Sequence, residues 1–127
     1  MRPLKTETMT DPLFQPLTIR HVTFKNRFMS TSHACGLEEG GMPKERYQRY
    51  HEEKARGGIG LTMFGGSSNV APDSPSVFQQ LYVGDDEVIP YLSQFSERVH
   101  QHGAAIMCQI THLGRRGEPY AGHWLPT

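Results

Sequence analysis

Two short apolar runs, each following a helical pattern that ends in glycine, constrain the fold of this chain most strongly. The runs are residues 59–64 and 104–108, and the glycines are Gly57, Gly58 and Gly103. A short, mainly apolar run is typical of a strand that is covered on both faces, as in a parallel sheet. The pattern therefore predicts strands linked by helices, with the helices packed outside a parallel sheet.

Both predicted helices carry start and stop signals. We expect the first to begin at Pro43, which suits the first helical position, and to end at Gly57-Gly58. The second is expected to be capped by Asp85 or Asp86 and to end at Gly103. One face of this second helix is apolar at helical spacing, at Val88, Leu92, Phe95 and Val99.

The segment before the first helix predicts a hairpin and one more strand. Apolar and polar residues alternate over residues 17–24, which favours a short β-hairpin, and residues 26–31 form a strand pattern that becomes polar at its end. Residues 1–12 are polar and contain two prolines, so we interpret them as a flexible tail. Residues 13–127 would then form one domain.

Both an open doubly wound sheet and a (β/α)8 barrel begin with this order of elements. An open nucleotide-binding sheet usually carries a G-x-G-x-x-G fingerprint after its first strand, and this chain has none at residues 30–35. We therefore assign the chain to the α/β class, as the N-terminal portion of a (β/α)8 TIM barrel with an N-terminal β-hairpin. A complete barrel takes roughly 250 residues. The 127 residues thus predict truncation after about the third strand.

Composition excludes several classes of partner. The chain has 13 Lys and Arg against 13 Asp and Glu, so neither nucleic acid nor an anionic membrane is expected to bind it. The apolar runs are too short to span a bilayer, and the N-terminus lacks a secretory apolar core, which predicts a cytoplasmic protein. Cys35 and Cys108 lie far apart, and His100 and His102 would lie on different helix faces. No metal site or disulfide is predicted.

Polar or small residues follow each of the three predicted sheet strands, at residues 31–34, 65–68 and 109–116. The carboxyl ends of parallel barrel strands meet at one rim, where barrel enzymes carry their chemistry. Glycines let a flat ligand approach the backbone, and the Gln109 carboxamide can donate and accept hydrogen bonds at once. Each feature alone favours a structural role, and only their placement at three successive strand ends makes a functional role equally compatible with the sequence. For His33 in particular, a ligand contact and a hydrogen bond within the barrel top both stay open.

Several short motifs occur in order along the chain: PLTI at 16–19, KNRF at 25–28, GLEE at 36–39, ARGG at 55–58, HGA at 102–104 and QITHLGR at 109–115. Together they resemble the old yellow enzyme, or NADH:flavin oxidoreductase, family. The resemblance covers about residues 13–118 and is strongest in the branch of the 2,4-dienoyl-CoA reductases and the trimethylamine and dimethylamine dehydrogenases.

The resemblance implies a barrel that the N-terminal hairpin closes at the bottom, with FMN lying across the top. Carried over by position, the cofactor-binding residues are Thr31, Ser32, His33, Ala34, Gly66 and Gln109. In the amine dehydrogenases of this branch, a cysteine at the position of Ala34 is bonded to the flavin. Here the cysteine follows one position later, as Cys35, and on an extended backbone it faces the other side. Non-covalent FMN is therefore expected.

By resemblance, the function is that of an FMN-dependent oxidoreductase. It would transfer hydride between NAD(P)H and a small organic substrate, either an activated alkene such as an enoyl thioester or an N-methylated amine. A 4Fe-4S cluster is implied only for a longer protein, and the sequence leaves the oligomeric state open. The alternative is a catalytically inert truncated fragment, which needs the missing half-barrel to bind flavin.

Overall fold

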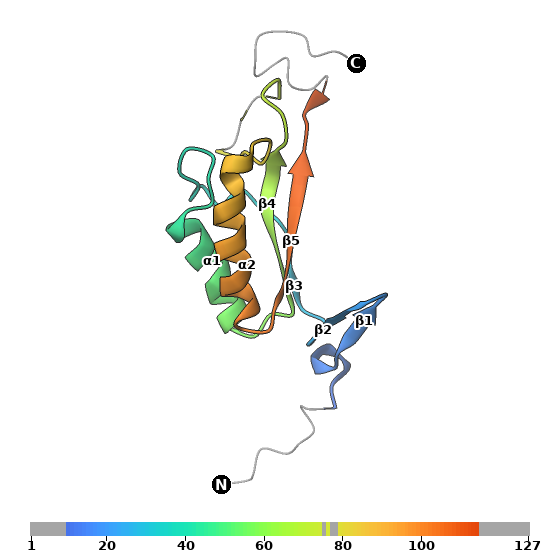
Figure 1. The fold of residues 1–127 in the computed structure, drawn as a ribbon. Helices are drawn as coiled ribbons and strands as arrows, with labels where there is room; N and C mark the ends of the chain where they lie inside the picture. Colours follow the sequence, from blue (N-terminus) through green and yellow to red (C-terminus); the bar gives the residue numbers. More distant parts are fainter. Residues whose placement is uncertain (1–9, 75, 77–78, 115–127) are drawn as a thin grey trace.

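The computed structural model describes residues 10–74, 76 and 79–114. Its centre is a parallel three-stranded sheet in the order β3-β4-β5, with both helices packed on one face (Figure 1). Each helix links two neighbouring parallel strands, which confirms the predicted strand–helix alternation. The elements are β3 (Met29–Ser30), α1 (Glu45–Arg56), β4 (Leu61–Asn69), η3 (Asp86–Val88), α2 (Ile89–His100) and β5 (Ala105–Thr111). Most of the predicted tail, residues 1–9, lies outside the described residues.

The predicted hairpin is present and lies beside the start of β3 (Figure 1). Its strands are β1 (Leu17–Ile19) and β2 (Val22–Phe24), and the short 3-10 helix η2 (Pro12–Phe14) precedes them. Two side chains after β2 tie the hairpin to the sheet. The Nζ of Lys25 donates to the carbonyl of His102 at 2.7 Å, and the Nδ2 of Asn26 donates to the carbonyl of Gly58 at 2.7 Å. The hairpin therefore connects to the segments that enter β4 and β5.

The core lies between the sheet and the two helices. Fully burying a large apolar side chain stabilises a fold by roughly 1.5–3 kcal/mol. Phe64 of β4 packs on Phe95 of α2 with ring centroids 4.8 Å apart. The buried cluster comprises Tyr47, Ala55, Phe64, Leu81, Phe95, Val99 and Ala104.

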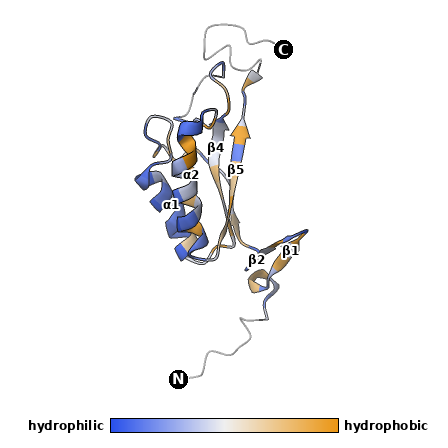
Figure 2. Cartoon of the chain, viewed as in Figure 1, coloured by the Kyte–Doolittle hydropathy of each residue, from blue (hydrophilic) through white to orange (hydrophobic). Residues whose placement is uncertain are grey.

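Helix α1 turns an unusually polar face to this core. Its surface is largely hydrophilic in Figure 2, and its buried residues are Tyr47, Gln48, His51 and Ala55. The Nδ1 of His51 lies 3.0 Å from the Oγ1 of Thr62 on β4, while its Nε2 has no hydrogen-bond partner among the described residues. Burial, followed by the charges of Lys54 and His33, lowers the pKa of His51 to about 3. The imidazole is therefore neutral in the folded chain at neutral pH.

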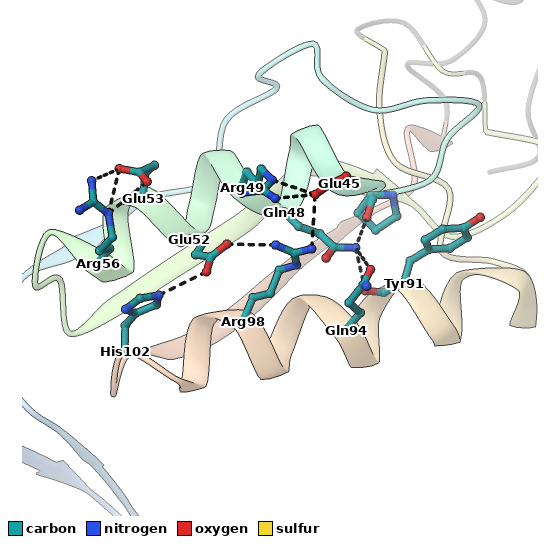
Figure 3. Close-up of polar contacts among 11 residues, drawn as sticks. Glu45, Gln48, Arg49, Glu52, Glu53, Arg56, Tyr91, Gln94, Arg98 and His102 are labelled. Atoms are coloured by element: carbon teal, nitrogen blue, oxygen red, sulfur yellow. Dashed lines mark hydrogen bonds and ion pairs between the residues drawn. The ribbon is translucent and has the colours of Figure 1, made fainter.

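Polar side chains also join α1 to α2 along one seam (Figure 3). Arg98 of α2 contacts Glu52 at 3.2 Å and Glu45 at 3.8 Å, and the Nε2 of His102 lies 3.3 Å from Glu52. The Nε2 of Gln48, which is fully buried, donates to the Oε1 of Gln94 on α2 at 3.0 Å. Because these groups bridge elements far apart in sequence, they fix how the helices lie on the sheet.

Four sequence expectations need correction or refinement. Helix α1 begins at Glu45, so Pro43 precedes it rather than occupying its first position. Strand β4 runs on to Asn69 instead of ending at residue 64, because a register shift lets the glycines continue the strand. Strand β3 has only two residues. Asp85 does cap the second helical segment, with its Oδ1 accepting from the Glu87 amide at 2.9 Å.

Strand β5 was expected to be buried on both faces, and this is wrong for one of them. Ile106 and Cys108 pack against the core, whereas Met107, which alternation places on the other face, is 44% exposed. In the ranges that the structure describes, helices cover only one face of the sheet. None of the described helices is long and apolar enough to cross a membrane.

The neutral His51 makes stability depend on pH. Its folded pKa of about 3 lies below the ordinary value of 6.5, so the unfolded chain binds the extra proton between these values. Stability is thus full above pH 6.5 and falls as the pH drops toward 3. Between pH 7.5 and pH 5 we expect His51 to contribute a loss of roughly 2 kcal/mol in the free energy of unfolding.

Urea unfolding at the two pH values measures this loss. His51→Gln, which cannot titrate but can still bond Thr62, should remove it. An unaltered pH dependence in His51→Gln would contradict the assignment.

Candidate functional site

The carboxyl ends of the three parallel strands meet at one edge, and the six predicted site residues lie there together. The Ser32 hydroxyl, after β3, donates to the Oε1 of Gln109 on β5 at 2.6 Å. A Cβ atom placed on Gly66 of β4 would lie 2.2 Å from the amide nitrogen of Ala34 and from the carbonyl carbon of His33. Thr31 joins them through its carbonyl, 3.4 Å from the Nδ1 of His33.

A bulge in β4 forms the centre of this edge. Phe64 pairs with Cys108 and Ser68 pairs with Ile110, so residues 65–67 lie opposite Gln109 alone. Their φ angles are 112°, 50° and 77°, all in the left-handed region. Glycine adopts such angles freely, whereas Ser67 is strained there by about 1–2 kcal/mol. Sequence reasoning found the small residues but not the bulge, although paired glycines within a strand pattern are a signal for one.

Three side chains hold the bulge in place. The Tyr47 hydroxyl accepts from the Gly65 amide at 3.0 Å, and the Gln109 Oε1 accepts from the Ser67 amide at 3.1 Å. The Nε2 of Gln80 donates to the Ser67 carbonyl at 2.8 Å. Tyr47 and Gln80 are both buried. Sequence reasoning missed both: the helical pattern marked Tyr47 only as a helix residue, and nothing in the loop pattern distinguishes Gln80.

The His33 side chain extends toward helix α1. Its Nε2 lies 2.7 Å from the Tyr50 hydroxyl, and the two rings meet edge-on with centroids 5.5 Å apart. Lys54 lies 4.6 Å from the centre of the Tyr50 ring and donates to the Ser30 hydroxyl at 3.0 Å. The structure therefore shows the hydrogen bond within the barrel top that the sequence left open. The backbone of His33, rather than its imidazole, lies against Gly66.

The two cysteines of the chain lie near this edge in different surroundings. Cys108 lies 3.6 Å from the Ser68 hydroxyl, and burial raises the pKa of its thiol. Cys35 packs against the hydrophobic core cluster. The segment after β5 is ordered by His112, whose Nε2 lies 3.1 Å from Asp73. Residues 115 and 116 of the third predicted strand end lie outside the described residues.

The edge is suited to a flat, uncharged ligand that carries carbonyl groups. The Oε1 of Gln109 already accepts two hydrogen bonds, so its Nε2 remains as a donor, and it meets no acceptor among the described residues. Gln109 is exposed, and so are Thr31 and Ala34. A ligand can therefore reach the amide from solvent.

Residues 12–121 match the model of the NADH:flavin oxidoreductase / NADH oxidase family. The chain belongs to this family. Family membership confirms the resemblance drawn from the motifs at 16–19, 25–28 and 109–115. It also makes this chain part of an oxidoreductase family whose description names flavin and NADH.

Two curated family relatives are similar over most of this chain. The multifunctional alkene reductase/demethylase OYE of Caballeronia cordobensis is 61% identical over 121 residues, which is 95% of this chain and 18% of the relative. The probable N-methylproline demethylase of Rhizobium meliloti (strain 1021) is 48% identical over 116 residues, 91% of this chain and 17% of the relative. The chain thus spans less than a fifth of each relative's length.

A solved structure supports the fold. The old yellow enzyme from Trypanosoma cruzi matches with a TM-score of 0.72 and 24% identity, over 88% of this chain and 30% of the solved chain. This likeness concerns the fold alone. It confirms the fold class predicted from the sequence, the N-terminal portion of a (β/α)8 barrel with its hairpin.

The close approach at Gly66 predicts a large effect of a single methyl group. Gly66→Ala combines an unfavourable φ of 50° with a clash against the backbone of residues 33 and 34. Gly40→Ala is a matched control, because its φ is 62° but nothing lies within 4 Å of the added Cβ. We expect Gly40→Ala to cost roughly 1 kcal/mol and Gly66→Ala a further 1–3 kcal/mol in urea unfolding. Equal losses would show that the 33–34 segment does not pack on Gly66.

Proposed function

We propose that this chain forms the flavin-binding N-terminal part of an FMN-dependent oxidoreductase. The flavin ring would lie along Thr31 to Ala34, over Gly66 and beside Gln109. The observation that carries the proposal is the fixed Gln109 carboxamide. Ser32 and Ser67 both donate to its Oε1, which leaves the Nε2 as a donor at the shared strand edge.

The residues present fit a flavin ring. Its pyrimidine portion carries carbonyl oxygens, which the Gln109 Nε2 can bond. The Gly66 position keeps the edge flat, because no side chain rises from it between the 33–34 segment and the bulge. Bound FMN supplies hydride transfer between a reduced nicotinamide and an organic substrate. The chain's own residues hold the ring, orient it and direct a hydrogen-bond donor at its pyrimidine edge.

The substrate class is proposed as an activated alkene or an N-methylated amine. The names of the Caballeronia and Rhizobium relatives include alkene reductase and demethylase activities. Both classes are small molecules, and NAD(P)H is the proposed partner in hydride transfer. A 4Fe-4S cluster belongs to this proposal only if the chain is part of a longer protein.

Non-covalent binding of FMN is part of the proposal. Ala34 offers no nucleophile, and the neighbouring Cys35 packs against the core cluster on the helix side of the sheet. A thiol held in the core cannot reach a ring that lies along the strand edge. The flavin is therefore expected to be released when the chain unfolds.

FMN titration tests both binding and its non-covalent character. The purified chain with FMN should give a yellow complex of one flavin per chain, and acid denaturation should release all flavin with no change in polypeptide mass. The competing candidate, an inert fragment, is favoured by the exposed Met107 on the uncovered face of β5. A colourless aggregate would support that candidate, and a mass increase equal to FMN would refute non-covalent binding.

Gln109→Glu separates flavin binding from the architecture of the site. A carboxylate keeps the acceptors for Ser32 and Ser67 but loses the Nε2 donor and adds a negative charge. We expect FMN to bind at least roughly tenfold more weakly, as for the loss of one hydrogen bond, with the thermal midpoint little changed. Gln101→Glu, on an exposed residue after α2, controls for the added charge. Undiminished affinity in Gln109→Glu would exclude Gln109 as a flavin ligand.

A further inference from the structure

We propose that Tyr47 is a positioning residue for the flavin, acting through the backbone of the bulge at residues 65–67. This inference rests on the proposed function, because it assigns Tyr47 a role at the same strand edge. Tyr47 lies on α1, on the helix side of the sheet, and its hydroxyl accepts from the Gly65 amide at 3.0 Å. It can therefore influence a ring on the strand edge only through the main chain between them.

The surroundings of Tyr47 argue that its hydroxyl has a purpose beyond packing. The side chain is 3% exposed, and its ring lies among His51, Phe64 and Phe95 with centroids 5.2 to 6.4 Å away. A phenylalanine would fill this space equally well. A buried hydroxyl is unfavourable unless it is hydrogen-bonded, and here its partner is the Gly65 amide.

The bulge needs support of this kind. Gly65, Gly66 and Ser67 all have positive φ, and a backbone in such a conformation persists only where its surroundings determine it. Gln109 and Gln80 bond Ser67 at one end of the bulge. Tyr47 bonds Gly65 at the other end, where it supplies the acceptor that a strand carbonyl would provide in a regular ladder. Gly66, the residue proposed to lie beneath the ring, is thus fixed from both sides.

The chemical state of Tyr47 suits a fixed support. Burial raises the pKa of its hydroxyl well above the usual value, and the bond from Gly65 offsets this only in part. The hydroxyl therefore stays protonated and neutral over the whole range in which flavoenzymes work. Its bond to Gly65 provides a constant geometry that does not change with pH.

Tyr47→Phe in the chain loaded with FMN tests the proposal, with Tyr91→Phe on α2 as the matched control. The variant keeps the ring and removes only the acceptor of the Gly65 amide. We expect amide hydrogen exchange at Gly65 to be roughly tenfold faster, the FMN dissociation constant to rise roughly tenfold, and the visible spectrum of the bound flavin to shift. Tyr91→Phe should change none of these.

The readouts separate this inference from the proposed function. If the unsubstituted chain binds no FMN, the proposed function fails, and exchange at Gly65 still reports whether Tyr47 holds the bulge. If the unsubstituted chain binds FMN but Tyr47→Phe leaves the dissociation constant and flavin spectrum unchanged, the positioning role is overturned while the function stands. If Tyr47→Phe does not fold, amide hydrogen exchange at Gly65 in the unsubstituted chain tests the inference instead. Protection of the Gly65 amide comparable to that of the Thr62 amide supports its bond to Tyr47. Exchange at the rate of an exposed amide overturns it.

Discussion

The structure at the carboxyl ends of the three strands depends on the bulge between β4 and β5, where residues 65–67 lie opposite Gln109 alone. A regular ladder would place the side chains of residues 65–67 alternately on the two faces of the sheet. The bulge instead turns their backbone toward Gln109 and the segment at 33–34. Glycine at two positions of the bulge removes the steric barrier to a positive φ angle, and Ser67 is moderately strained at its positive φ. A flat surface formed by main chain is the result.

This backbone surface is connected to the packed side of the sheet. Tyr47, His51 and Gln48 are buried on one face of α1, and each bonds a group outside its own helix or at its start. Buried polar groups whose hydrogen bonds are all satisfied make the core rigid and specify one arrangement. The polar face of α1 therefore buries less apolar surface than an apolar face would, but its hydrogen bonds fix the position of the helix on the sheet. The seam of Arg98 and Glu52 extends the same principle to α2.

Much of this architecture could be predicted from local patterns, whereas contacts between residues far apart in the chain could not. Apolar runs, the cap at Asp85 and the glycines after the helices gave the strands, helices and their order, because each depends on neighbouring residues. Pro43 was placed two positions too far into α1, which begins at Glu45 after the extended backbone of Lys44. The site residues at 31–34, 66 and 109 followed from a family motif. Tyr47 and Gln80 did not, because their partners lie 18 and 13 positions along the chain.

The ties between the hairpin and the sheet have a consequence for how the molecule comes apart. Lys25 bonds the carbonyl of His102 and Asn26 that of Gly58, while Gly60 lies so close to Asn26 that an added Cβ would be 2.7 Å from its carbonyl oxygen. The hairpin thus contacts the entry to both long strands. Separating it from the sheet would free the turns that set both strands in register. The hairpin and the two βα units should accordingly behave as a single cooperative unit.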